Sequence, residues 1–320
     1  MRTAELTSED ERYLAIAEDH RDHHMTAPVL SNFRVVAVFA YEDRDGEHKH
    51  VVGANCECAN IGGALCAERS AICQLQLLPV KRVRAVYIVS DADVCLTPGT
   101  LCREFLSSSP FFTPQTPFIS RATNCKPCVT TLAELYPFPS IYGWRGRQEV
   151  LHFGESFSQV SSDMEANGDL SHFVQAQLTG LTSIEQSAYI AAHKATAKDS
   201  RDDLFPIRYA AAVLFNDGSF RVAWQHKTLE YGSSLDAISK LITFIEARME
   251  DDASVRPTLI LQVDQFGILH APTARARAYF YEYSFQGVEI LVHDDNAKLQ
   301  RVTVGNLVFE SPDCIASSCS

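Results

Sequence analysis

The stretch FRVVAVFAYEDRDGEHKHVVG, residues 33–53, has the composition of a β-hairpin. Phe33–Tyr41 and His50–Gly53 predict two strands because both are rich in β-branched or aromatic residues. The polar segment Asp43-Arg44-Asp45-Gly46 predicts the turn between them, since Asp and Gly favour tight turns. A hairpin therefore begins the predicted sheet in this part of the chain.

The residues after this hairpin predict a helix and a buried strand. Ala67–Leu77 has helical periodicity, and Ala85–Val89 (AVYIV) is a continuous apolar run, which is typical of a strand covered on both faces. A hairpin followed by alternating helices and strands predicts a three-layer α/β/α sandwich built on a mixed sheet.

The second half of the chain repeats this pattern. Arg208–Phe215 and Phe220–Trp224, joined by Asn216-Asp217-Gly218, predict a second hairpin. The first strand of this hairpin starts at Arg208, and the first strand of the other hairpin starts at Phe33. We call the sequence separation of these two positions the offset between the halves.

Two pairs of predicted helix starts share nearly the same offset. Ser8 and Ser183 have the same offset as Phe33 and Arg208. Each of these serines has Glu or Gln three residues later, as in a capping box. The offset between Pro98 and Pro272 is one residue shorter. Each of these prolines predicts a helix with proline at its first position. A nearly constant offset across different segments predicts a duplicated domain.

A polar segment separates the two halves. Gly154–His172 is rich in Ser, Asp and Glu and has the composition of a linker. We therefore expect a first domain over residues 1–155, a linker over 156–173, a second domain over 174–310 and a flexible tail over 311–320.

Composition and charge narrow the class of protein. The 320 residues include 28 Lys and Arg against 40 Asp and Glu, a net charge of −12, so we expect no nucleic-acid partner. No run approaches the ~18 apolar residues of a membrane span, so we expect no membrane partner. The first residues lack the apolar core of a signal peptide, so we expect a cytoplasmic protein.

The ten cysteines are unevenly distributed: eight lie between Cys56 and Cys128, and two lie in the tail. This clustering in one half favours reduced thiols, some of them metal ligands, over a disulfide framework. We expect four of the others to be small buried apolar side chains, namely Cys56, Cys58, Cys73 and Cys95.

The residues that could bind a metal or act in catalysis lie at two predicted helix starts. Cys66 lies at the start of one helix, where free N–H groups favour a thiolate, and Glu68 follows two residues later. Cys102 and Arg103 lie at the start of the next helix. Two such helix starts at the carboxyl edge of a sheet could bind a cation and a small molecule. The same pattern also fits two buried cysteines beside a surface glutamate.

At these positions the sequence resembles the cytidine deaminase family. The family's two zinc-site motifs correspond to Cys66-Ala67-Glu68 and to the segment from Pro98 to Cys102-Arg103-Glu104. The family's upstream N-x-E segment is similar to Asn55-Cys56-Glu57, its S-x-F to Ser31-Asn32-Phe33, and its later T-x-x-E-L-L-P stretch to Thr130–Pro137. The resemblance covers nearly all of residues 5–145.

The second half resembles the inactive partner domain of the two-domain, homodimeric members of that family. Gly232 and Ser234 fall near the positions of Cys66 and Glu68, and Ala276 stands opposite Cys102. The resemblance therefore implies a homodimer whose metal site lies in the first half alone.

One position departs from the family pattern. Gly99 stands where the family has the first cysteine of its second motif, so one of three expected zinc ligands is absent. Cys95, Cys125, Cys128 or water could take its place, or no zinc binds. For the C-x-x-C pair of Cys125 and Cys128, a structural or incidental role is favoured.

The resemblance implies a zinc mechanism. Zn²⁺ held by Cys66, Cys102 and a third ligand would lower the pKa of its water, and the hydroxide would attack C4 of cytosine. Glu68 would carry the proton to N3 and to the departing amine. Arg69 would donate hydrogen bonds to the thiolates.

The resemblance also implies the substrate contacts. Asn55 and Glu57 would hydrogen-bond the ribose, and Phe33 would pack on the nucleoside, although core packing explains Phe33 equally well. The backbone N–H of Ala67 would contact the base edge.

Three functions follow from these residues. The favoured one is a zinc-dependent deaminase of pyrimidine salvage that converts cytidine or deoxycytidine to the uridine form and releases ammonia. The alternative is a catalytically impaired pseudoenzyme that binds a nucleoside or a partner protein. A polynucleotide-editing deaminase is disfavoured by the net charge of −12.

Overall fold

The computed structural model describes residues 2–3, 5–58, 63–143, 145–159, 171–230 and 234–308. The chain divides into two compact units, Met1–Pro137 and Phe138–Val308, and each has its own sheet. The predicted tail, residues 311–320, and most of the predicted linker lie outside the described residues.

The first unit contains a mixed sheet with the order β1-β6-β5-β4-β2-β3. Strands β4 and β5 are parallel, and the other neighbours are antiparallel. The strands are β1 (Arg2–Thr3), β2 (Val35–Asp43), β3 (His48–Ala54), β4 (Val80–Ser90), β5 (Pro117–Ala122) and β6 (Cys125–Thr131).

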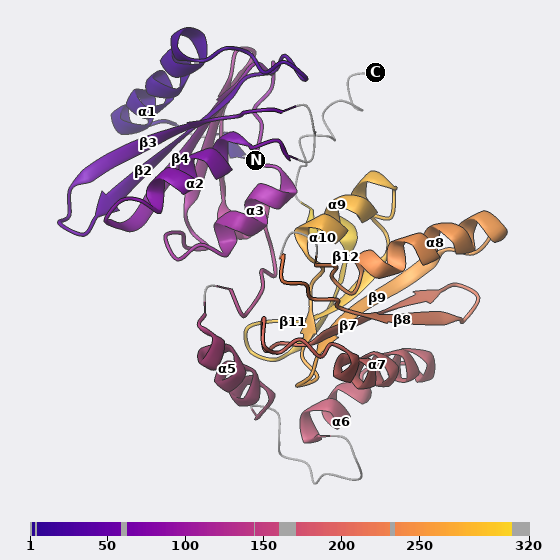
Figure 1. Cartoon of the computed structure of the whole chain (residues 1–320). Coiled ribbons are helices and arrows are strands. Elements are labelled where there is room, and N and C mark those ends of the chain that lie inside the picture. The colour runs from indigo at the N-terminus through magenta and orange to yellow at the C-terminus, as the bar shows by residue number, and fades with distance from the viewer. Residues whose placement is uncertain are drawn as a thin grey trace. The chain divides into compact units, whose positions relative to one another are not determined.

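Helices cover both faces of this sheet (Figure 1). Helix α1 (Ser8–Asp19) packs on the face that presents Val36, Val38 and Tyr87. Helices α2 (Ala67–Leu75), α3 (Thr100–Ser107) and α4 (Leu132–Leu135) pack on the face that presents Ala37, Phe39 and Ile88. A π-helical turn, η1 (His20–His24), follows α1. The predicted three-layer sandwich on a mixed sheet is confirmed.

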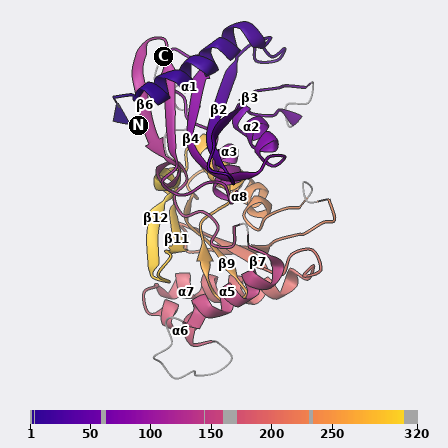
Figure 2. The ribbon, with the colours of Figure 1, turned by 90° about the vertical axis from the view of Figure 1, so that its left-hand side faces the viewer.

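The second unit has the same architecture. Its sheet has the order β12-β11-β9-β7-β8, of which β12, β11, β9 and β7 are seen side by side in Figure 2. Helix α7 packs on one face, and α8 and α9 pack on the other. The elements are α5 (Arg147–Gln159), α6 (His172–Leu178), α7 (Ser183–Ala195), η3 (Thr196–Lys198), β7 (Tyr209–Phe215), β8 (Phe220–Trp224), α8 (Ser239–Asp251), β9 (Pro257–Asp264), β10 (Leu269–His270), α9 (Ala274–Glu282), β11 (Glu289–His293), β12 (Leu299–Thr303) and α10 (Val304–Leu307).

A buried arginine occupies the same place in both units. In the first, Arg103 donates to Pro98 O at 2.6 Å and to Leu135 O at 3.2 Å. In the second, Arg277 donates to Pro272 O at 2.8 Å and to Leu307 O at 3.4 Å. Repetition of strand order, layers and this arginine contact agrees with the predicted duplication.

The helix starts differ from prediction by one or two positions. The capping boxes use Thr7 with Asp10 and Thr182 with Glu185, each one residue before the predicted Ser8 and Ser183 pairs. Either hydroxyl could cap a helix, but Thr7 and Thr182 have the extended backbone that a cap requires.

The two prolines precede their helices instead of starting them. Gly99 is the N-cap of α3 and Thr273 is the N-cap of α9, so Pro98 and Pro272 lie one residue outside. The carbonyls of these prolines accept the buried arginine bonds instead.

The units divide at Pro137, before the expected domain boundary at residue 155. Helix α5 spans that boundary and packs within the second unit, where Val150 contacts the cluster of Tyr142 and Ile207. Among the described residues, no helix is both long enough and apolar enough to span a bilayer.

The arginine contacts give a stability prediction. Replacing Arg103 with Met should lower the free energy of unfolding by on the order of 3 kcal/mol, because buried carbonyls lose charged donors. Denaturant unfolding followed by circular dichroism measures the change. Exposed Arg44, replaced with Met, is the control and should shift it by less than about 0.5 kcal/mol. Equal shifts in the two variants would contradict the role given to Arg103.

Candidate functional site

A close backbone contact sets the start of helix α2. Gly53 in β3 lies so near the helix that a Cβ placed on it would come within 2.3 Å of Ala67 O and 2.4 Å of Ala71 N. Only glycine allows this approach without a shift of the backbone. Sequence reasoning gave Gly53 no role, although a glycine inside a strand is a known sign of close approach.

A short bridge then directs the chain into α2. Cys56 and Leu65 exchange backbone hydrogen bonds of 2.9 and 2.8 Å, and Cys66 follows as the helix N-cap with extended dihedrals, φ −70° and ψ 157°. The thiol of Cys66 therefore lies at the start of the helix, as the sequence predicts.

Three side chains form what we call the thiol–carboxylate group: Cys66, Glu68 and Cys102. Their ligand atoms all lie within 4.8 Å of one another. Cys102 is fully buried, Glu68 is 4% exposed, and Cys66 is partly exposed. Among the described residues, this is the group of His, Cys, Asp or Glu side chains placed to hold a metal ion.

The pKa values of the three side chains in this group are shifted in different directions. A hydrogen bond from Cys102 lowers the pKa of the Cys66 thiol to about 6, with Arg69 contributing. The same hydrogen bond and burial raise the pKa of Cys102. Burial, together with the negative charge of Cys66, raises the pKa of Glu68 to about 7. These shifts favour a thiolate at Cys66 and a neutral thiol at Cys102.

Arg69 lies beside this group. Its Nη2 donates to Ala64 O at 3.0 Å and contacts Cys66 Sγ at 3.6 Å. The guanidinium is placed to offset the negative charge of a thiolate at Cys66.

Asn55 organises the backbone near Phe33. Its Oδ1 accepts from Val35 N at 2.8 Å, and its Nδ2 donates to Phe33 O at 2.9 Å. The carboxamide therefore already holds the segment that carries the half-buried Phe33 ring.

Glu57 holds the residue two positions before Phe33. Its carboxylate accepts from Ser31 N at 2.9 Å and from Ser31 Oγ at 2.6 Å, and these bonds lower the pKa of Glu57. The N-x-E and S-x-F segments that the sequence singled out are thus connected to each other by hydrogen bonds.

Gly99 is the residue at which the family resemblance expects a further cysteine. It is the N-cap of α3, with φ −61° and ψ 155°, and a Cβ placed on it would meet no atom within 4 Å. The position is thus compatible with a side chain but supplies none.

The other cysteines among the described residues lie outside the thiol–carboxylate group. Cys95 is buried, and its sulfur lies 3.1 Å from that of Cys125. Cys128, partly exposed, lies with its sulfur 3.4 Å from Lys126 O. The expectation of burial is correct for Cys95 and wrong for Cys56, Cys58 and Cys73, which are exposed. Cys73 lies on the face of α2 opposite the buried residues Ala71 and Leu75.

The second unit holds different residues at the equivalent positions. In the first unit Cys56 and Leu65 form an isolated bridge, and in the second unit His226 and Leu235 form the equivalent bridge. Asp236, which follows Leu235, therefore corresponds to Cys66. Ile238 then corresponds to Glu68, which corrects the expected match to Ser234, while Gly232 lies outside the described residues. Ala276 is the third residue of α9, as Cys102 is of α3, so that match is confirmed.

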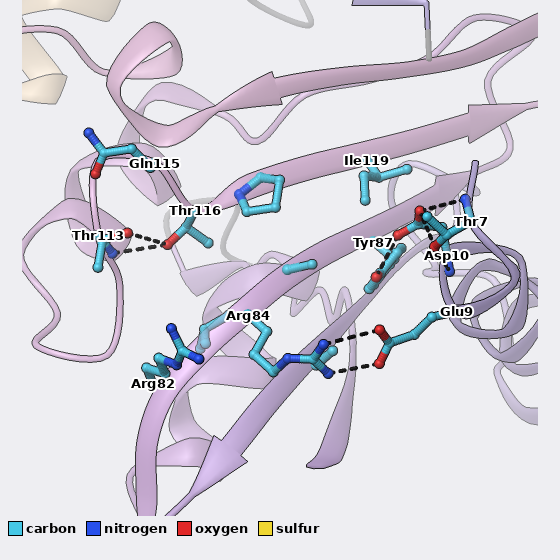
Figure 3. A pocket seen from close by; sticks show the side chains of 14 residues that line it. Thr7, Glu9, Asp10, Arg82, Arg84, Tyr87, Thr113, Gln115, Thr116 and Ile119 are labelled. Carbon is cyan, nitrogen blue, oxygen red and sulfur yellow. Dashed lines mark hydrogen bonds and ion pairs between the residues drawn. The ribbon is translucent and has the colours of Figure 1, made fainter. Parts of the chain in front are cut away.

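A pocket of about 420 Å³ lies on the other face of the first sheet (Figure 3). Its charged side chains already have partners: Arg84 pairs with Glu9 at 2.7 Å, Asp10 accepts from Tyr87 at 2.9 Å, and Arg82 pairs with Glu42 at 2.8 Å. No member of the thiol–carboxylate group lines it. We therefore assign the chemistry to the helix starts and not to this pocket.

Comparisons with known proteins give similarity at the level of solved structures. No protein-family model matches the chain, and neither does any curated protein. The chain is similar to a cytidine deaminase from Burkholderia pseudomallei, with 23% identity over 42% of this chain and 100% of that one, at a TM-score of 0.35.

Two mycobacterial cytidine deaminases show the same degree of similarity. The Mycobacterium leprae protein is 21% identical over 39% of this chain and 98% of its own, with a TM-score of 0.32. The Mycobacterium tuberculosis protein is 19% identical over 40% and 96%, also with a TM-score of 0.32. Solved cytidine deaminases are thus similar to this chain, and the geometry of the site has to support any function given to it.

Proposed function

We propose that the first unit is a zinc-dependent nucleoside deaminase that converts cytidine or deoxycytidine and water to the uridine form and ammonia. The observation that supports this proposal is the thiol–carboxylate group: two cysteines and a buried glutamate within 4.8 Å at two helix starts. Burial of a carboxyl beside two thiols costs free energy, and buried titratable groups with shifted pKa values are concentrated at functional sites.

The donor set fits a zinc ion. Thiolates and carboxylates are both zinc ligands, and zinc sites in enzymes have three protein ligands and one open position. Cys66 and Cys102 would hold the ion, water would take the third position, which Gly99 leaves without a side chain, and Glu68 would stay beside the ion as the proton carrier. When bound there, zinc would supply a Lewis acid that makes water acidic near neutral pH.

The residues of the chain have separate tasks in this proposal. Glu68 takes one proton from water and passes it to N3 of the cytosine. As the bond between C4 and the amino nitrogen breaks, Glu68 moves the second proton of that water to the leaving amine, a task that suits a buried carboxyl. Arg69 offsets the negative charge of the thiolate at Cys66.

The sugar would contact the N-x-E segment. Glu57 already accepts two hydrogen bonds from Ser31, and its carboxylate oxygens have further lone pairs for a ribose hydroxyl. Asn55 uses both ends of its carboxamide on the backbone, so we propose that it positions Phe33 against the nucleoside. Ala67 is the first residue of α2, and its free backbone N–H would contact the base edge.

Gly99 supports a second candidate function. A site with two cysteines where three are expected fits a pseudoenzyme that binds a nucleoside or a partner protein without turnover. The homodimer, the cytoplasmic location and the role in pyrimidine salvage remain predictions.

Glu68 is the residue to test first. Glu68→Gln should lower the rate of ammonia release from cytidine at least about 100-fold while zinc content stays the same, because the amide cannot carry the proton. A coupled ammonia assay and metal analysis measure the two quantities. Glu47→Gln, in an exposed turn, is the control and should leave the rate unchanged. Retained turnover in the Glu68 variant would remove Glu68 from its proposed role.

Gly99 offers a gain-of-ligand test. Gly99→Cys should bind zinc at least about tenfold more tightly in competition with a chromophoric chelator, since a third thiolate joins the site without a clash. Gly99→Ala adds the same Cβ without sulfur and should bind zinc as the wild type does. If the Cys and Ala variants behave alike, Gly99 does not occupy a ligand position.

A further inference from the structure

Two cysteines outside the proposed site lie in direct contact. Cys95 belongs to the segment between β4 and α3, and Cys125 is the first residue of β6. Their sulfur atoms are 3.1 Å apart. Cys95 Sγ also donates to Ser120 O at 3.2 Å, which holds its sulfur beside the β5–β6 hairpin.

This geometry is close to that of a disulfide. A disulfide bond measures about 2.05 Å, so the two sulfurs need to approach by only about 1 Å. The hairpin is tight, since Ala122 pairs with Cys125, and this fixes the backbone from which Cys125 projects. Cys95 is buried and Cys125 is partly exposed, so a reagent from solvent can reach one member of the pair.

We propose that Cys95 and Cys125 form a redox-modification site that closes to a disulfide by exchange with a small disulfide such as oxidised glutathione. The thiolate of Cys125 attacks oxidised glutathione, forms a mixed disulfide and releases one glutathione thiolate. The thiol of Cys95 then loses its proton, its sulfur attacks the sulfur of Cys125, and the second glutathione leaves. Two protein thiols are oxidised, and one glutathione disulfide is reduced to two thiols.

The crosslink would fasten a segment that leads to the proposed active site. Cys95 lies four residues before Gly99, the N-cap of α3, and Cys102 lies in the first turn of that helix. The inference does not depend on deaminase activity, because it concerns thiols outside the thiol–carboxylate group.

Peptide mapping of the zinc-loaded full chain tests the pairing. After exposure to oxidised glutathione and blocking of free thiols, trypsin should give residues 85–103 crosslinked to residues 122–145, since Lys126 is followed by proline and resists cleavage. If residues 85–103 are crosslinked to residues 50–69, which contain Cys66, and not to residues 122–145, the proposal is overturned.

Variants identify the sulfurs within these peptides. The crosslink should persist in Cys128→Ser and in the exposed control Cys73→Ser, and it should disappear in Cys125→Ser and in Cys95→Ala. A crosslink that persists in Cys125→Ser would show that Cys128 is the partner, and this would overturn the assigned pair.

An equilibrium measurement needs no variant. In glutathione redox buffers, the native chain should favour the Cys95–Cys125 disulfide at least about tenfold more than the same chain in concentrated guanidinium chloride, because folding holds the sulfurs in contact. Equal equilibrium constants in the folded and unfolded chains would overturn the proposal.

Discussion

The proposed active site depends on the absence of a side chain at Gly53. The strand and helix α2 approach so closely there that a Cβ would lie 2.3 Å from Ala67 O, and this contact sets the position of the helix start. Cys66 and Glu68 lie at that start, and α3 brings Cys102 to within 4.8 Å of them. A buried charge is stable only where its partners are fixed in place, so the seating of α2 determines whether the thiol–carboxylate group can form.

In the second unit, the strand position equivalent to Gly53 has a side chain, and the helix start is different. Ala223 pairs with Ala211 in the register that Gly53 has with Ala37, so a Cβ is present where the first unit has none. Helix α8 begins at Ser239, three residues after Asp236, whose carboxylate accepts from Ile238 N at 3.0 Å and Ser239 N at 2.9 Å. The backbone donors at this helix start are thus satisfied by Asp236. The two units share the sheet architecture and the buried arginine, but the thiol–carboxylate group lies in the first unit.

The sequence predicted the fold well because strands and turns carry local signals. Both hairpins, with Gly46 and Gly218 in left-handed conformations, and the buried strand β4 lie where the composition placed them. The helix caps were off by one residue because neighbouring Thr and Ser are equally able to cap.

For the candidate site, the sequence singled out Cys66, Glu68 and Cys102, which the structure brings together, and the meaning of Gly99 stays a prediction. Sequence reasoning missed the close approach at Gly53, the hydrogen bonds of Asn55 to the backbone and the contact of Cys95 with Cys125, because these depend on how segments distant in sequence pack together.

The central claim is best tested by following uridine formation from cytidine by NMR with the zinc-loaded chain, before and after removal of the metal. We predict uridine formation that is lost on chelation and restored by zinc. A chain that holds one zinc ion and forms no uridine, or one whose rate is unaffected by chelation, would contradict the account.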